Sequence, residues 1–215
     1  MIRPAITTVC FMIFFASSVL GQAEQPNLDS AMSAIRRAAD KFPPTFSSEA
    51  EQANVLRLWH WVESGLQASL EAKTAPEKDL ELLLGEIYRL GHNLDIEGAG
   101  DKAVSHLNRA ITLDPINPKP YLLLGRHLTF KGSYTDGELA LLHAYILSPP
   151  ENLVDLQFLL ANNYYFQKRF ALALAMISRI PPDHPAARAS TVIRDNSRKA
   201  LETGVAPKTI EIDIP

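Results

Sequence analysis

Residues 118–151 read PKPYLLLGRHLTFKGSYTDGELALLHAYILSPPE. Two apolar segments in this stretch are separated by a short run of turn-forming residues. In the second segment, Gly137, Leu141 and Ala144 recur at steps of four and three, which is the spacing of one face of an α-helix. Pro149 follows, and proline ends helices because it lacks an amide donor and clashes with the preceding turn. The stretch therefore predicts two consecutive helices closed by a proline.

The same pattern occurs before and after this stretch, in three sets with spacings of four, three and five: Ala103, Leu107, Ala110 and Pro115; Gly137, Leu141, Ala144 and Pro149; Ala173, Ile177, Ile180 and Pro185. Upstream of each set, a small residue precedes a large one by three positions, in Gly85 and Tyr88, Gly125 and Leu128, and Ala161 and Tyr164. Small residues at helix contacts allow two helices to approach closely. The same order of small and large residues therefore occurs three times along the chain.

This pattern resembles the tetratricopeptide repeat (TPR) family, whose unit is a helix–turn–helix of about 34 residues. The units are placed near residues 78–117, 118–151 and 154–187, within an array spanning 78–187. The resemblance implies an all-α fold, a right-handed helical-repeat solenoid of about three TPR units. Two departures are visible. The aromatic residue usual near the start of the first helix is present only as Tyr121, and the first unit has extra residues within 91–101.

The chain before the array predicts an N-terminal helical pair over residues 24–76. The apolar face of its first helix, expected at about 27–42, is Leu28, Met32, Ile35, Ala39 and Phe42; that of the second is Val55, Trp59, Val62, Leu66 and Leu70. Ser48 with Glu51, and Thr74 with Glu77, have the spacing of capping boxes.

After the array, residues 188–203 predict a C-terminal capping helix, with an apolar side in Ala189, Val192, Ile193 and Ala200. Residues 204–215 are expected to be a flexible tail. Alternating isoleucines at 210, 212 and 214 leave open a strand added to a partner or folded back on the chain.

Residues 1–23 have the order of a secretory signal: a positive charge at Arg3, an apolar run, then small residues at cleavage points near Gly21 and Ala23. We expect export, to a periplasm or outside the cell, with no stable membrane insertion if the signal is cleaved. The alternative is a membrane anchor retained at the N-terminus. Cys10, the one cysteine in the sequence, lies inside this segment, which excludes a disulfide framework within one chain.

Charge and motifs narrow the function classes. Twenty-one basic against 24 acidic residues give a net charge of −3, which provides no electrostatic reason to bind nucleic acid. No P-loop, dinucleotide fingerprint, nucleophile elbow or helical zinc motif occurs in the sequence. We expect no cofactor, no metal site and no catalytic residues. A third hypothesis is a hydrolytic site around His92, Asp95 and Asp101. It is the weaker one, because acidic residues in a loop are typically exposed to solvent.

In the TPR family, the first helix of each unit lines a concave groove that holds a peptide or a partner helix. The resemblance carries this role to eight positions: Glu86, Arg89, Lys119, Leu122, Arg126, Phe158, Asn162 and Tyr165. Arg126 is expected to pair with a carboxylate, and Phe158 and Tyr165 to act as apolar anchors. The alternative is that the chain's own N-terminal helices or C-terminal tail cover some of them.

The sequence thus favours an exported TPR adaptor or scaffold that binds another protein or peptide in its concave groove, and it is not expected to be an enzyme. The alternative is a membrane-tethered assembly factor held by an uncleaved N-terminal segment.

Overall fold

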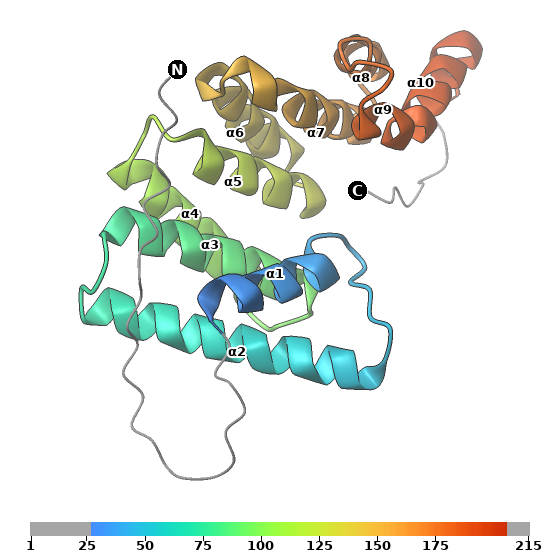
Figure 1. Cartoon of the computed structure of the whole chain (residues 1–215). Helices are drawn as coiled ribbons and strands as arrows, with labels where there is room; N and C mark the ends of the chain where they lie inside the picture. The colour runs from blue at the N-terminus through green and yellow to red at the C-terminus, as the bar shows by residue number, and fades with distance from the viewer. Residues whose placement is uncertain (1–26, 206–215) are drawn as a thin grey trace.

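A computed structural model describes residues 27–205, and the predicted signal at 1–23 and most of the predicted tail lie outside them. This part of the chain is all-helical and contains no strand (Figure 1). The elements are α1 Leu28–Ala39, α2 Glu49–Glu71, α3 Glu77–Asn93, α4 Ala99–Leu113, α5 Pro118–Phe130, α6 Tyr134–Leu147, the 3-10 turn η1 Pro150–Asn152, α7 Leu153–Phe166, α8 Phe170–Ile177, α9 Pro185–Ala189 and α10 Thr191–Thr203. The prediction of an all-α fold is confirmed.

The helices after α2 pack as consecutive pairs. The most extensive contacts join α3 to α4, α5 to α6 and α7 to α8, and each pair contacts the next through α4 with α5 and α6 with α7. The first helices of the pairs also contact one another in series, α3 with α5 and α5 with α7. Figure 1 shows this succession from α3 to α8, with α1 and α2 at one end and α9 and α10 at the other.

Small residues set the distance between the paired helices, as the spacing predicts. A Cβ atom added to Gly85 would lie 2.6 Å from the Leu107 side chain, and one added to Gly125 would lie 2.9 Å from the carbonyl oxygen of Gly137. Real Cβ contacts this short are essentially never seen. The glycines are therefore required for the close approach of α3 to α4 and of α5 to α6.

The other periodic positions are buried as the pattern predicts. The nine small and large positions of the second helices are all buried: Ala103, Leu107, Ala110, Gly137, Leu141, Ala144, Ala173, Ile177 and Ile180. The last of the nine lies beyond the end of α8 at Ile177, so the third pair has a short second helix. Pro185 was predicted to end the second helix of this pair, but α8 ends at Ile177 and Pro185 is the first residue of α9.

In the first pair, the additional residues mainly lengthen the helices. α3 has 17 residues and α5 has 13, and only residues 94–98 separate α3 from α4. Gly98, with φ of 71°, adopts the left-handed conformation that glycine favours and immediately precedes α4. The extra residues of the first unit therefore extend its helix ends and do not form a long loop.

The N-terminal helices follow the predicted faces with two corrections. The Oγ atom of Ser48 caps α2 by accepting from the amide of Glu51 at 3.2 Å, as predicted. The prediction that Thr74 caps the next helix is wrong, because α3 begins after Pro76 and has no side-chain cap. Phe42 was expected on the buried face of α1, but the helix ends at Ala39 and the Phe42 side chain is exposed.

The C-terminal cap is divided into α9 and α10, and only part of its predicted apolar side is buried. Ile193, Ser197 and Ala200 form the buried face of α10, which contacts α7 and α8. Val192 is exposed, so its assignment to the buried side is wrong. The steps of four and three from Ile193 to Ala200 explain the difference, since Val192 lies about 100° away from this face.

Two large apolar clusters form the core. One joins α1, α2, α3 and the start of α4, and the other joins α6 to α10. Between them lies a small cluster built on Leu107, Leu123, Leu124 and Ala140. Buried polar side chains, including Arg89 and His127, lie on α3 and α5 near this junction. Polar contacts thus contribute to joining the two halves of the molecule.

Candidate functional site

Two arginines from different helix pairs converge on one carboxylate. Arg89 lies on α3, Arg126 on α5, and Asp40 directly follows α1. Nη2 of Arg89 donates to Oδ1 of Asp40, and Nη1 of Arg126 donates to Oδ2 at 2.9 Å. Nη2 of Arg126 also donates to the main-chain oxygen of Asp40 at 2.6 Å. We call Arg89, Arg126 and Asp40 the two-arginine cluster.

A second ion pair lies next to this cluster. Glu86, one turn before Arg89 on α3, accepts from Nε of Arg36 at 2.7 Å and from Nη2 of the same residue at 2.9 Å. Nζ of Lys119, near the start of α5, lies 3.6 Å from Oε2 of Glu86. Four cations therefore share two carboxylates at the place where α1, α3 and α5 meet.

The electrostatics follow from burial and from this unequal number of charges. Burial opposes ionisation of Asp40, but Arg89 and Arg126 outweigh it and hold the pKa of its carboxyl below the ordinary value. Burial also opposes ionisation of Glu86, and Arg36 with Lys119 lowers its pKa in turn. Burial and the charge of Arg126 together lower the pKa of Arg89, against the effect of Asp40. An arginine remains charged nonetheless, so the cluster holds surplus positive charge.

The arginines keep donors that Asp40 does not use. The Nε atoms of Arg89 and Arg126 are buried and have no hydrogen-bond partner among the residues that the structure describes. A buried guanidinium donor without a partner is unfavourable. Asp40 therefore accepts from only part of the hydrogen-bond donors of Arg89 and Arg126.

The predicted groove positions fall into two groups. Glu86, Arg89 and Arg126 meet at the junction with α1, while Lys119 keeps 51% of its side chain exposed beside them. Leu122 is partly buried between the middle and C-terminal apolar clusters. The expected pairing of Arg126 with a carboxylate occurs within the chain, through Asp40.

The remaining three positions lie on α7 and are buried. Phe158 is 4% exposed and Asn162 is 1% exposed. Nδ2 of Asn162 donates to the Phe158 carbonyl of its own helix, and its Oδ1 has no partner among the described residues. The Tyr165 hydroxyl accepts from Nδ2 of Asn196 on α10 at 3.4 Å. Neither aromatic side chain is therefore presented as an open anchor, and the contact to Tyr165 comes from the C-terminal helix α10, not from the N-terminal helices.

Arg36 and Asp40 complete the site, and neither is among the residues predicted from the sequence. Arg36 lies in the last turn of α1 and Asp40 directly follows the helix. The local sequence does not show whether a charged residue there forms a buried ion pair or remains in solvent. A charged residue directly after an amphipathic helix is the only local signal.

The residues of the weaker hydrolytic hypothesis are not arranged as a metal centre. Asp101 pairs with Nζ of Lys131 at 2.7 Å, and the His92 ring packs edge-on against the ring of His127 at 5.0 Å between centroids. Asp95 has a positive φ of 59° in the turn after α3. Within residues 27–205, no group of three His, Cys, Asp or Glu side chains is placed to hold a metal ion.

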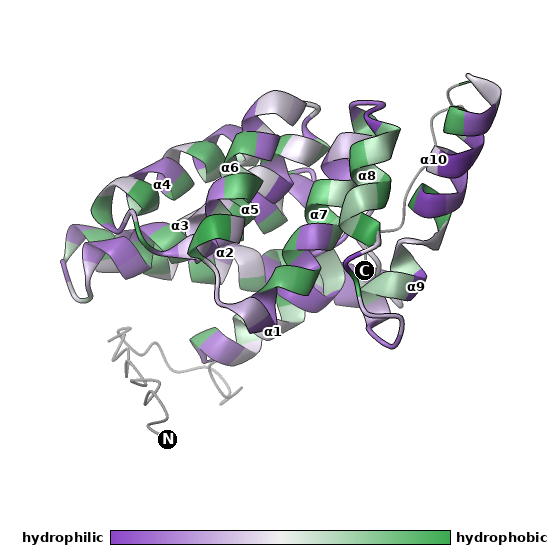
Figure 2. Cartoon of the chain, turned by 90° about the horizontal axis from the view of Figure 1, so that it is seen from above, coloured by the Kyte–Doolittle hydropathy of each residue, from purple (hydrophilic) through white to green (hydrophobic). Residues whose placement is uncertain are grey.

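An apolar groove that was not predicted from the sequence lies between α4, α5 and α6, away from the two-arginine cluster. It has a volume of about 380 Å³. Leu139 of α6 lines it and is 58% exposed. The other apolar lining residues are Val104, Ile111, Leu124, Leu128 and Ala140. Figure 2 shows that hydrophobic residues also dominate α8.

None of the helices in residues 27–205 combines the length and the apolar character needed to cross a bilayer. Comparison of the chain with models of known protein families gave no match, and comparison with curated proteins gave no match either.

Proposed function

We propose that the chain is an exported adaptor that binds another protein, and that its helix pairs are about three TPR-type units of a right-handed solenoid. The binding face in this proposal is the one formed by the first helices, α3, α5 and α7. The chain's own α1 contacts α3 at one end of this face and α10 contacts α7 at the other end, and the half-exposed Lys119 lies on α5 between them.

One observation carries the proposal: the first helices contact one another in series, α3 with α5 and α5 with α7. Among the described helices, α4, α6 and α8 do not form such a series. When the first helices of a stack of helix pairs lie closer to one another than the second helices do, the stack curves toward the side of the first helices. That curvature supports a concave face on α3, α5 and α7, which is the shape that repeat proteins use for binding.

Exposed cations on and beside this face support binding of a partner. Lys119 is half exposed, and Arg36 is 40% exposed beside it. Arginine is favoured at protein interfaces because its planar group donates several hydrogen bonds at once. A partner that approaches α5 would meet these cations first.

The proposal is tested by cross-linked capture from an extract of the source cells, with the full chain as bait. Lys119→Glu reverses a charge on the proposed face. Arg179→Glu, at an exposed position just beyond α8, is the matched control with the same change in charge. Circular dichroism confirms that both variants keep their helix content.

We expect a partner that is captured by the unmodified chain and by Arg179→Glu but is lost with Lys119→Glu. Equal capture by all three chains would move the binding surface away from α5, and the absence of any specific partner would contradict the adaptor proposal. Mass spectrometry of the chain recovered from cells tests export, since removal of the first 21 to 23 residues is expected.

A further inference from the structure

We propose that Arg89 and Arg126 form a binding site for an acidic side chain of a partner, and that Asp40 is an internal ligand that occupies this site. The inference rests on the proposed function, because it names the chemistry that the α3 and α5 face would recognise. The ligand class is a peptide segment containing an aspartate or glutamate.

The contacts made by Asp40 are those of a bound peptide residue. Both carboxylate oxygens are used, one by each arginine, and the main-chain oxygen is bound as well by Nη2 of Arg126. The arginines come from two different helix pairs, and Asp40 is separated from Arg126 by 86 positions in the sequence. Recognition therefore involves a carboxylate and the carbonyl group of the same residue.

The arginine side chains are buried and their donors are not exhausted. The Arg89 side chain is 3% exposed and that of Arg126 is 11% exposed. Their two Nε atoms lack partners among the described residues. Two adjacent guanidinium groups repel each other, so the pair is stable only when an acceptor of opposite charge lies between them. A single carboxylate, itself partly exposed, is the least that this arrangement requires.

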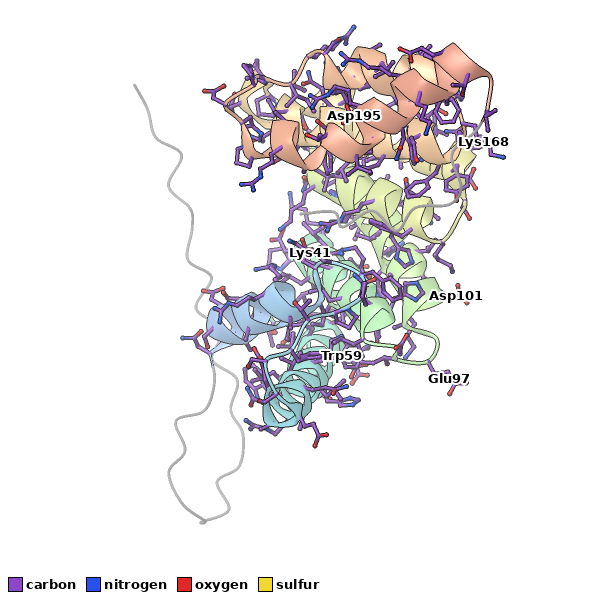
Figure 3. The ribbon with its side chains drawn as sticks, turned by 90° about the vertical axis from the view of Figure 1, so that its right-hand side faces the viewer. Lys41, Trp59, Glu97, Asp101, Lys168 and Asp195 are labelled. Atoms are coloured by element: carbon purple, nitrogen blue, oxygen red, sulfur yellow. The ribbon has the colours of Figure 1, made fainter. Side chains whose placement is uncertain are left out.

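The occupied position can be reached from the surface. The Asp40 side chain is 37% exposed, and the residues that follow it, Lys41, Phe42 and Pro43, are exposed. Figure 3 shows Lys41 where the chain leaves α1, between the helices of the N-terminal half and those above it. A partner's acidic side chain would approach from the exposed side of Asp40.

Asp40 can be exchanged without releasing α1. The helix is held by Met32, Ile35 and Ala39 in the N-terminal core, and by Nδ2 of Asn93, which donates to the Ala39 carbonyl at 2.8 Å. Asp40 lies outside this apolar contact, at the C-terminal boundary of the helix. Removal of its carboxylate would leave the arginines in place on α3 and α5, with only the main-chain oxygen of residue 40 still accepting from Arg126.

The test uses full-length Asp40→Ala and a fluorescein-labelled peptide that copies residues 37–43, RAADKFP. A control peptide has asparagine in place of aspartate. Fluorescence anisotropy measures binding of each peptide to the unmodified chain, to Asp40→Ala and to the double variant Asp40→Ala/Arg126→Gln. If Asp40→Ala loses its helix content by circular dichroism, Asp40→Asn, which keeps the size of the side chain, replaces it in both variants.

We expect Asp40→Ala to bind the aspartate peptide at least about tenfold more tightly than the asparagine peptide, because charge-assisted hydrogen bonds are worth more than neutral ones. The unmodified chain should bind the aspartate peptide at least about tenfold more weakly than Asp40→Ala does, since its site is occupied. The Arg126→Gln change should remove the preference for aspartate.

Equal binding of both peptides to Asp40→Ala would overturn the carboxylate site. Equally tight binding of the aspartate peptide to the unmodified chain would overturn the role of Asp40 as internal ligand. These results do not depend on capture of a natural partner. A peptide preference without any captured partner contradicts only the adaptor proposal, and a captured partner without a peptide preference contradicts only the acidic ligand.

Discussion

Replacing Gly125 with alanine should force α5 and α6 apart. The added Cβ atom would lie 2.7 Å from Cγ of Leu141, 2.8 Å from the Leu141 amide nitrogen and 2.9 Å from the carbonyl oxygen of Gly137. Two of these three atoms belong to the backbone of α6, so a rotamer change cannot relieve the contact. The helix must shift by roughly half an ångström to restore ordinary van der Waals distances.

The expected loss of stability is the difference between two effects. Overpacking a close contact costs about 3 kcal/mol when backbone must move, and alanine in a helix interior is favoured over glycine by about 1 kcal/mol. The net loss for Gly125→Ala is therefore about 2 kcal/mol. For a chain of this length, that lowers the unfolding temperature by about 4–8 °C.

Thermal unfolding followed by circular dichroism measures this change. Gly100→Ala is the matched control, because the three atoms nearest to its Cβ all belong to the ring of His92, at 3.1–3.5 Å, and none of them is a backbone atom. The control should change the free energy of unfolding by no more than about 0.5 kcal/mol. An unfolding temperature for Gly125→Ala equal to or above that of the unmodified chain would show that the helices are not held at the glycine contact.

Other changes test the polar contacts between the two halves. Asp40→Ala should lower the free energy of unfolding at pH 7 by about 2 kcal/mol, less than for a fully buried pair because the side chain is partly exposed. Since the pKa of Asp40 is lowered in the folded protein, its contribution to stability is present above pH 4 and is lost as the pH falls through the folded value. Urea unfolding at pH 3 should therefore show a smaller difference between the variant and the unmodified chain. Burial lowers the pKa of His127 to about 4 while Nε2 lies 3.0 Å from the Gly100 carbonyl oxygen. As the pH drops, the unfolded chain therefore protonates His127 before the folded chain does, and the free energy of unfolding should fall by up to about 3 kcal/mol between about pH 6.5 and 4. His127→Gln should remove this pH dependence of the free energy of unfolding. Asn163→Ala, which removes donors to Thr129 and to the backbone of α6 in a fully buried position, should cost about 2 kcal/mol in chemical denaturation.

Much of the fold follows from local spacing. Small and large residues at steps of four and three fix one face of a helix wherever it packs, so positions such as Ala103, Leu141 and Ala173 are buried as expected. Errors occur at helix ends. Phe42 continues the apolar spacing of α1, but the helix stops at Ala39, and the spacing itself contains no information on that stop.

The site was less predictable than the fold. Spacing placed Arg89 and Arg126 on the first helices, and both are found in one cluster. Their partner Asp40 comes from a helix that does not belong to the repeats. Its position depends on how α1 docks on α3, through contacts such as Asn93 with Ala39, and a single sequence gives no direct record of such long-range pairs.

The most direct test of binding through the α5 face is photo-cross-linking from a chosen position. Cys10 is the sole cysteine of the chain, so Cys10→Ser allows one new cysteine to carry a benzophenone label. The label is placed by Lys119→Cys on α5 or by Arg179→Cys beyond α8, and each labelled chain is irradiated in an extract of the source cells. We expect one specific partner cross-linked from position 119 and absent from position 179. The same partner cross-linked with equal yield from both positions, or from position 179 alone, would contradict binding at α5.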